Sequence, residues 1–138
     1  MILNWIGLIA GTATFLGIWI GHVSVRKIEY LSPTIWVASI VALSLGVLLE
    51  FGALASKNIY LSAALGIFGI TVLWDALEFW RQHQRVRKGH APANPNNPRH
   101  ARLLQSSRTS TTIDWLERNP IGRQLSKDEI QRIQEGWR

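Results

Sequence analysis

The feature that most constrains this chain is an uncharged stretch of 22 residues, Ile2–Val23, in which only His22 could titrate. As a helix rising ~1.5 Å per residue it would be about 33 Å long, enough to cross the hydrocarbon core of a bilayer. A signal peptide has a basic segment before its apolar run, whereas here Arg26 and Lys27 follow it, with no Ala-x-Ala-like cleavage site. We therefore expect a membrane-spanning helix at about residues 2–23.

Two further apolar runs follow, at about 34–55 and 59–79. Only Glu50 interrupts the first of them, and Asp75 and Glu78 come near the end of the second. No segment alternates with period two for the ten residues that a strand of a membrane barrel needs. The sequence therefore predicts an all-α membrane protein whose three helices, joined by loops of about nine and about four residues, form an antiparallel bundle.

Charge divides the chain into two parts. Residues 1–80 carry three basic and four acidic groups, whereas residues 81–138 carry twelve basic and five acidic groups. The first loop contains Arg26 and Lys27, and basic residues follow the third span, so the positive-inside bias places both segments in the cytoplasm. We expect an integral protein of the plasma (inner) membrane with its N-terminus outside, its C-terminus in the cytoplasm and anionic lipid as a partner of the basic face.

The predicted domains are a three-helix transmembrane domain at 1–89 and a basic cytoplasmic tail at 90–138. No Gly or Pro interrupts 78–88, so the third helix should extend into the cytoplasm and end at Gly89. Residues 90–100 contain three prolines and predict an extended Pro/Asn segment, and the polar residues 101–111 are expected to lack regular structure. Short tail helices are expected at about 113–119 and 127–135, with too few apolar residues to form a core alone.

Span one carries four glycines in two pairs with a spacing of four residues. These are Gly7, Gly11, Gly17 and Gly21. Small residues at this spacing let another helix approach closely. The glycines either pack the three helices together or dock one face onto a partner subunit.

Several ionisable residues lie in or beside the spans. His22, Asp75 and Glu78 should fall at the same depth, where they could relay protons, hold a pigment or haem, or pair with the neighbouring basic residues. Glu50 lies near the outer end of span two and either reaches the headgroups or Lys57, or serves an ion path. One His and two carboxylates are too few for an intact zinc site, so no metal is predicted.

Two blocks resemble a family of small three-span prokaryotic membrane proteins known only as a domain of unknown function. The first block reads His22-x-x-Val25-x-Lys27-x-Glu29-Tyr30. The second follows Leu73-Trp74 and reads Glu78-x-x-x-Gln82-x-x-Arg85-Val86-x-Lys88-Gly89-x-x-Pro92-x-Asn94-Pro95. The resemblance covers roughly residues 4–98, with His90 and Ala91 at positions that are usually aromatic. It implies the three-span topology and no activity, and the tail beyond about Asn96 is additional.

The charged residues of the two blocks suggest a polar lock on the cytoplasmic face. Glu78 and Gln82 lie one turn apart on a helix, with Arg85 following. In this hypothesis Glu29 pairs with Arg85 or Lys88, and Lys27, Glu78 and Gln82 belong to the same group.

No phosphate-binding glycine loop, nucleophile–base arrangement or nucleic-acid module is recognisable, and the chain has no cysteine. We expect no enzyme and no nucleic-acid partner. The sequence favours a non-catalytic accessory or scaffolding subunit of a larger membrane complex, most plausibly a bioenergetic (respiratory or photosynthetic) one. The alternatives are a small homo-oligomeric ion or proton conductor, and a pigment- or haem-binding subunit that uses His22.

Overall fold

The computed structural model describes residues 4–114 and 127–136. These residues contain five helices and no strand: α1 (Trp5–Leu31), α2 (Ile35–Ala55), α3 (Ile59–Arg87), α4 (Pro98–Ser106) and α5 (Lys127–Glu135). The first three helices are each long and apolar enough to cross a membrane. The predicted all-helical fold with three such helices followed by short ones is confirmed.

The chain divides into two compact units, Met1–Gln82 and His83–Arg138. The boundary lies inside α3, earlier than the one expected after Gly89. The expected helix at 113–119 lies largely outside the described residues, and α5 occupies 127–135 as expected.

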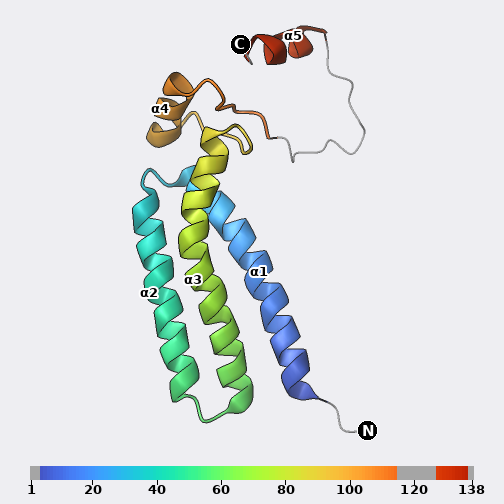
Figure 1. The fold of residues 1–138 in the computed structure, drawn as a ribbon, viewed down its shortest axis with the longest axis vertical. Coiled ribbons are helices and arrows are strands. Elements are labelled where there is room, and N and C mark those ends of the chain that lie inside the picture. Colours follow the sequence, from blue (N-terminus) through green and yellow to red (C-terminus); the bar gives the residue numbers. More distant parts are fainter. Residues whose placement is uncertain (1–3, 115–126, 137–138) are drawn as a thin grey trace. The chain divides into compact units, whose positions relative to one another are not determined.

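In the first unit α1, α2 and the first part of α3 lie side by side and alternate in direction (Figure 1). The connection between α1 and α2 is only three residues, Ser32-Pro33-Thr34, so the loop of about nine residues was wrong. No Gly or Pro occurs between Ser24 and Leu31 to stop the helix, and Pro33 then ends it because proline disfavours helical backbone at the preceding residue.

Side-chain caps mark the starts of α1 and α3. The Asn4 side chain accepts a hydrogen bond from the Gly7 backbone N–H and begins α1. The Asn58 side chain accepts from the N–H groups of Tyr60 and Leu61 and begins α3. At the start of both helices, an asparagine side chain therefore supplies an acceptor to N–H groups that would otherwise have no partner.

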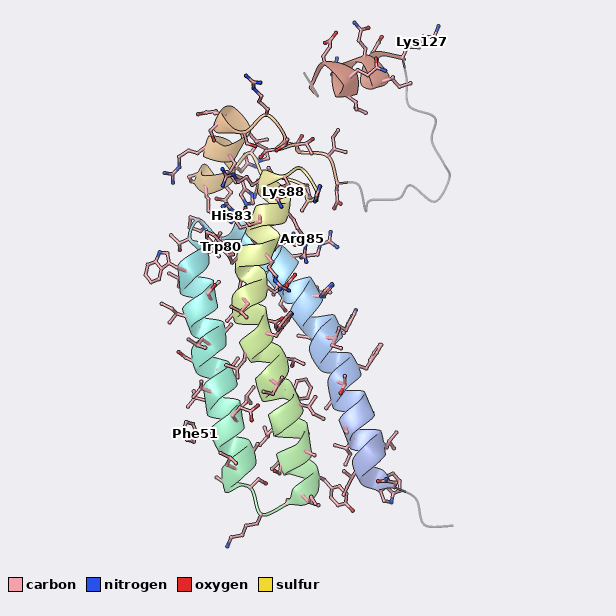
Figure 2. All side chains as sticks on the ribbon, in the orientation of Figure 1. Phe51, Trp80, His83, Arg85, Lys88 and Lys127 are labelled. Carbon is pink, nitrogen blue, oxygen red and sulfur yellow. The ribbon has the colours of Figure 1, made fainter. Side chains whose placement is uncertain are left out.

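Apolar side chains cover the outside of the first unit. Figure 2 shows Phe51 pointing away from the bundle, and 64% of its surface is exposed. A small core of Val25, Ala42 and Phe79 lies between the helices. An apolar exterior around a thin core suits a protein embedded in lipid, where exposed hydrocarbon is not penalised.

The second unit is organised around the end of α3. Val86, Ala91 and Ala93 form its apolar core, with Leu103 and Leu104 of α4 packed against them. The helix α4 contradicts two predictions, the extended segment at its last residues 98–100 and the lack of regular structure at 101–106. It begins at Pro98, where the Asn97 side chain caps it by accepting from the Arg99 N–H. Proline is well suited to the first turn of a helix, since its missing N–H would have no partner there.

Candidate functional site

The glycines of α1 divide into two groups with different surroundings. Gly17 and Gly21 are buried, and a Cβ at Gly17 would lie 2.8 Å from Thr71 Oγ1 of α3. A Cβ at Gly21 would lie 2.7 Å from both carboxylate oxygens of Asp75. These two glycines therefore pack α1 against α3 within the chain.

The other two glycines face open space or their own helix end. A Cβ at Gly11 would have nothing within 4 Å, and one at Gly7 would meet only the Asn4 cap. Both are exposed. Within the described chain, Gly7 and Gly11 are thus not used to pack the three helices.

An apolar groove of about 460 Å³ lies between α1 and α2, with α3 as its floor. Its small lining residues are Gly17, Gly21, Ser24, Ser32, Ala38 and Ala42. Asp75 and Thr71 of α3 supply polar atoms at the floor, and Phe79 adds an aromatic ring to the lining. The groove can therefore take an apolar occupant that also offers a hydrogen-bond donor to the Asp75 carboxylate.

The expected cluster of His22, Asp75 and Glu78 does not form a ligand set. His22 is exposed on α1, Asp75 is half-buried at the groove floor and Glu78 is buried. Among residues 4–114 and 127–136, the ligand atoms of these three residues do not gather into a group able to hold a metal ion. A His22 site for pigment or haem stays a prediction.

Glu78 interacts with a neighbouring residue of α3 within the first unit. Arg81 Nη1 lies 3.8 Å from Glu78 Oε2, and the Arg81 guanidinium stacks over the Trp74 ring at 4.8 Å. The side chain of Arg81 is 56% exposed, so this ion pair contributes little to the stability of the fold. Its main effect is to orient the two side chains. Cation–π stacking on Trp74 keeps the arginine stem along the helix.

The residues of the hypothetical polar lock differ in exposure. Glu29, Glu78 and Gln82 are buried, with Glu29 only 2% exposed, whereas Lys27 lies on the surface of α1. Arg85 and Lys88 are exposed at the end of α3. The structure thus identifies Glu29, Glu78 and Gln82 as buried polar groups, and the pairing of Glu29 with Arg85 or Lys88 stays a prediction.

The sequence left two roles open for Glu50: a contact with the headgroups or Lys57, or a place in an ion path. Glu50 does not reach Lys57: neither residue makes an ion pair in the described chain. Instead the Glu50 side chain lies against Gly69 of α3, and its Oε1 is buried without a hydrogen-bond partner.

The second unit contains a buried histidine that the sequence did not single out. His100 of α4 has no exposed surface, and its Nδ1 accepts a hydrogen bond from the Asn94 backbone N–H at 3.0 Å. A backbone N–H can only donate, so Nδ1 of His100 carries no proton. The N–H of this imidazole ring is therefore at Nε2. His100 therefore fixes the turn at Asn94 against α4.

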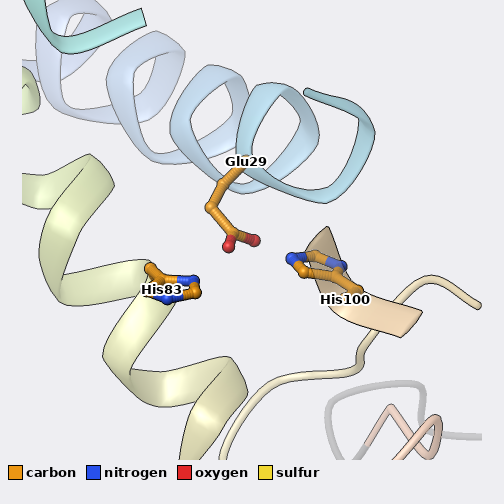
Figure 3. A group of neighbouring side chains, drawn as sticks. All are labelled: Glu29, His83 and His100. Carbon is orange, nitrogen blue, oxygen red and sulfur yellow. The ribbon is translucent and has the colours of Figure 1, made fainter. Parts of the chain in front are cut away.

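His83 lies beside His100 and has an analogous partner. Arg99 Nη1 is 2.6 Å from His83 Nδ1, and the ring nitrogens of the two histidines lie within 4.8 Å of each other (Figure 3). Because a guanidinium only donates, Nδ1 of His83 accepts. Both Nδ1 lone pairs are thus already used, so the pair serves the fold of the second unit better than it would serve a metal ion.

The end of α3 explains several residues of the second sequence block. Gly89 has φ +75°, and the N–H groups of Gly89 and His90 donate to the carbonyls of Val86 and Arg85. This is a Schellman motif, in which glycine takes the left-handed conformation without a steric penalty. The Arg87 carbonyl, at the end of α3, accepts hydrogen bonds from three hydroxyl groups of the loop that follows α4: those of Ser107, Thr109 and Ser110.

Three long apolar helices followed by a small hydrogen-bonded unit define a helical protein of the membrane-embedded class. The comparison of its sequence with known families gives a more specific result. The chain belongs to the family described as Domain of unknown function (DUF4491), which matches residues 4–97. The match ends at Asn97, the cap of α4, and no curated protein and no solved structure matches the chain.

Proposed function

We propose that this protein is a non-catalytic accessory subunit that docks, through the groove between α1 and α2, onto a transmembrane helix of a larger membrane complex. The groove is the observation that supports this function. Two of its small lining residues, Ser24 and Ala38, are only half-buried and allow a partner backbone to approach closely, which is how helices associate in lipid, where the hydrophobic effect between them is absent.

Asp75 favours a protein helix as the occupant of the groove. A carboxylate at the floor of an apolar groove in the membrane is costly unless it is paired. A partner helix can supply a donor such as a lysine, arginine or serine side chain, whereas a saturated acyl chain cannot. The expected partner is therefore a transmembrane helix with a polar residue that faces Asp75.

The second unit supplies the membrane-surface part of the proposal. Residues 83–114 contain six Lys or Arg residues and one acidic residue, Asp114. If this segment is cytoplasmic, each basic side chain near anionic headgroups contributes about 1 kcal/mol of attraction. Native mass spectrometry should find more phosphatidylglycerol retained by the wild type than by the Arg85→Gln/Lys88→Gln double variant, and equal retention would contradict this role.

The decisive experiment compares two valine variants of α2. Val41 and Val47 are both exposed, but only Val41 lines the groove. Val41→Trp should fill the mouth of the groove and lose a stoichiometric membrane partner in native gels with mass spectrometry, while Val47→Trp should retain it. A bioenergetic complex is the host class to test first.

Photocrosslinking identifies what occupies the groove. A photoreactive side chain at position 41 should crosslink to a transmembrane helix of one partner protein, and one at position 47 should not. Crosslinks only to lipid, or only to a second copy of this chain, would overturn the accessory function. Equal recovery of the partner by the Val41→Trp and Val47→Trp variants would also contradict it.

A further inference from the structure

Glu50 is the one charged residue of α2. It lies five residues before the end of the helix at Ala55, which corresponds to about 7 Å along the helix axis. When α2 crosses a membrane, this places the carboxyl inside the hydrocarbon near one end of the span. An ionised group at such a depth is expensive and is usually retained for a function.

The interface between α2 and α3 holds the Glu50 side chain in place. A Cβ at Gly69 would lie 2.9 Å from Glu50 Cδ and 3.1 Å from Cγ, so a side chain there would displace the carboxyl from this position. One helical turn before Glu50, Gly46 packs on Leu73. About one turn after it, Ala53 packs near Gly66, whose Cβ would lie 3.8 Å away. The carboxyl is therefore part of a small-residue interface, with Glu50 half-buried and its Oε1 buried.

Among residues 4–114 and 127–136, no counter-ion accompanies the carboxyl. Its Oε1 is buried without a hydrogen-bond partner, and the nearest lysine in the sequence, Lys57, makes no ion pair with it. The Ser62 hydroxyl, a possible donor on α3, instead donates to the Ala53 carbonyl at 2.8 Å. A carboxylate without a partner here would carry the full cost of an uncompensated charge in lipid.

We propose that Glu50 is a proton-binding site inside the membrane, positioned over Gly69 by α2 and α3. A bound proton removes the charge that neither the protein nor the lipid compensates. The site lies only five residues from the end of α2, so it can exchange its proton with the aqueous phase at that end. This proposal does not depend on the groove or on its partner.

A neutral carboxyl in an apolar site has a characteristic reactivity with dicyclohexylcarbodiimide, which enters lipid. The acid adds across one C=N bond: the carboxyl oxygen bonds to carbon and the proton goes to nitrogen. The acyl group then moves from oxygen to nitrogen and leaves a stable N-acylurea. No group leaves and nothing is oxidised or reduced, so the product carries the mass of one whole carbodiimide.

The first test treats the full-length protein in phosphatidylcholine–phosphatidylglycerol vesicles with this reagent and maps the adduct by peptide mass spectrometry. We expect one adduct on Glu50, none at that position in the isosteric Glu50→Gln variant, and an unchanged Glu50 adduct in Asp75→Asn. Circular dichroism checks that the variants keep their helix content. Labelling that spares Glu50 in the folded wild type would overturn the proposal.

The second test observes the proton directly by infrared spectroscopy of the same vesicles at neutral pH. The carbonyl band of a protonated carboxyl should be present in the wild type and in Asp75→Asn, and absent in Glu50→Gln. Absence of the band from the wild type would overturn the proposal. Sodium chloride that suppresses carbodiimide labelling, when choline chloride does not, would also overturn it by showing that the bound ion is sodium.

Discussion

At the scale of single residues, glycines of the spans make room for side chains of the neighbouring helix. Gly46 of α2 is the tightest of these positions that also meets backbone, since a Cβ there would lie 2.6 Å from Leu73 Cγ and 3.0 Å from the Leu73 backbone N. We expect Gly46→Ala to destabilise the first unit by about 1–3 kcal/mol through overpacking. Thermal unfolding in mild detergent, followed by circular dichroism, measures the loss.

Gly11→Ala is the matched control for this prediction. A Cβ at Gly11 meets nothing within 4 Å, and alanine favours a helix by about 1 kcal/mol over glycine. Gly11→Ala should thus be neutral or slightly stabilising in the isolated protein. If both variants lost the same stability, the Leu73 contact would not be the cause of the loss.

His100 is the corresponding residue of the second unit. Replacing it by alanine leaves the Asn94 N–H, now bonded to His100 Nδ1, without its acceptor in a buried turn. We expect His100→Ala to cost about 1–3 kcal/mol, the usual penalty of an unsatisfied buried donor. Hydrogen–deuterium exchange should show faster exchange of the Asn94 amide.

His90→Ala provides the comparison, because His90 is exposed and only its backbone N–H is used, by the Arg85 carbonyl. Its exchange rates should match those of the wild type. Unchanged protection of Asn94 in His100→Ala would show that the histidine does not hold this turn.

Residue patterns predicted some of these roles and not others. The spacing of Gly17 and Gly21 indicated a helix contact, and the structure shows that α3 makes it. The role of His100 could not be found in the same way, because Asn94 and His100 are six residues apart in a segment without periodicity. Only the fold brings that acceptor to that donor.

At the scale of elements, the junction after α3 depends on Gly89. A Cβ at this position would collide with the Thr109 carbonyl oxygen, and its φ of +75° is unfavourable for other residues. We expect Gly89→Ala to cost about 1–2 kcal/mol from backbone conformation alone, and to release the loop that caps α3. Exchange of the Ala93 amide, bonded to the Thr111 carbonyl, measures this release.

Lys88→Ala is the control for the junction. Lys88 precedes Gly89 and is exposed, and its N–H bond to the Gln84 carbonyl does not need the side chain. Protection of the Ala93 amide should remain in this variant. If Gly89→Ala also preserved it, the Schellman motif would not position the loop.

The helices that the sequence predicted best are those whose apolar runs are long. The prediction of about 34–55 lies within one residue of each end of α2, and α3 begins at Ile59 as predicted. By contrast, α1 continues eight residues beyond the expected end at Val23. Charges such as Arg26 and Lys27 end an apolar run without ending a helix, since basic residues are good helix formers. The helix α4 was missed because three prolines obscured the N-cap at Asn97.

At the scale of the whole molecule, different interactions stabilise the two units. The first has an apolar exterior and small residues between its helices, as expected for lipid-embedded helices. The second is polar and is held by caps, a Schellman motif and hydroxyl–carbonyl bonds around a core of three small residues. Hydropathy predicts the first kind of unit, whereas the second depends on hydrogen bonds between segments that hydropathy does not detect.

The orientation of the spans can be tested because the chain contains no cysteine. The positive-inside bias predicts that Lys57, between α2 and α3, lies outside and that the segment containing Gln105 lies in the cytoplasm. In intact cells a membrane-impermeant maleimide should label the Lys57→Cys variant, and label Gln105→Cys only after the cells are lysed. Both positions are exposed, so accessibility to solvent does not limit the reaction.

Each pattern of labelling has a distinct meaning. The reverse pattern would show that the protein is inverted, with three spans retained and the basic unit outside. In that case the attraction of the second unit to cytoplasmic anionic lipid would be wrong, while the Glu50 site would only change sides. Labelling of both cysteines in intact cells would place both ends of the third span on one side, and would contradict a transmembrane α3 altogether.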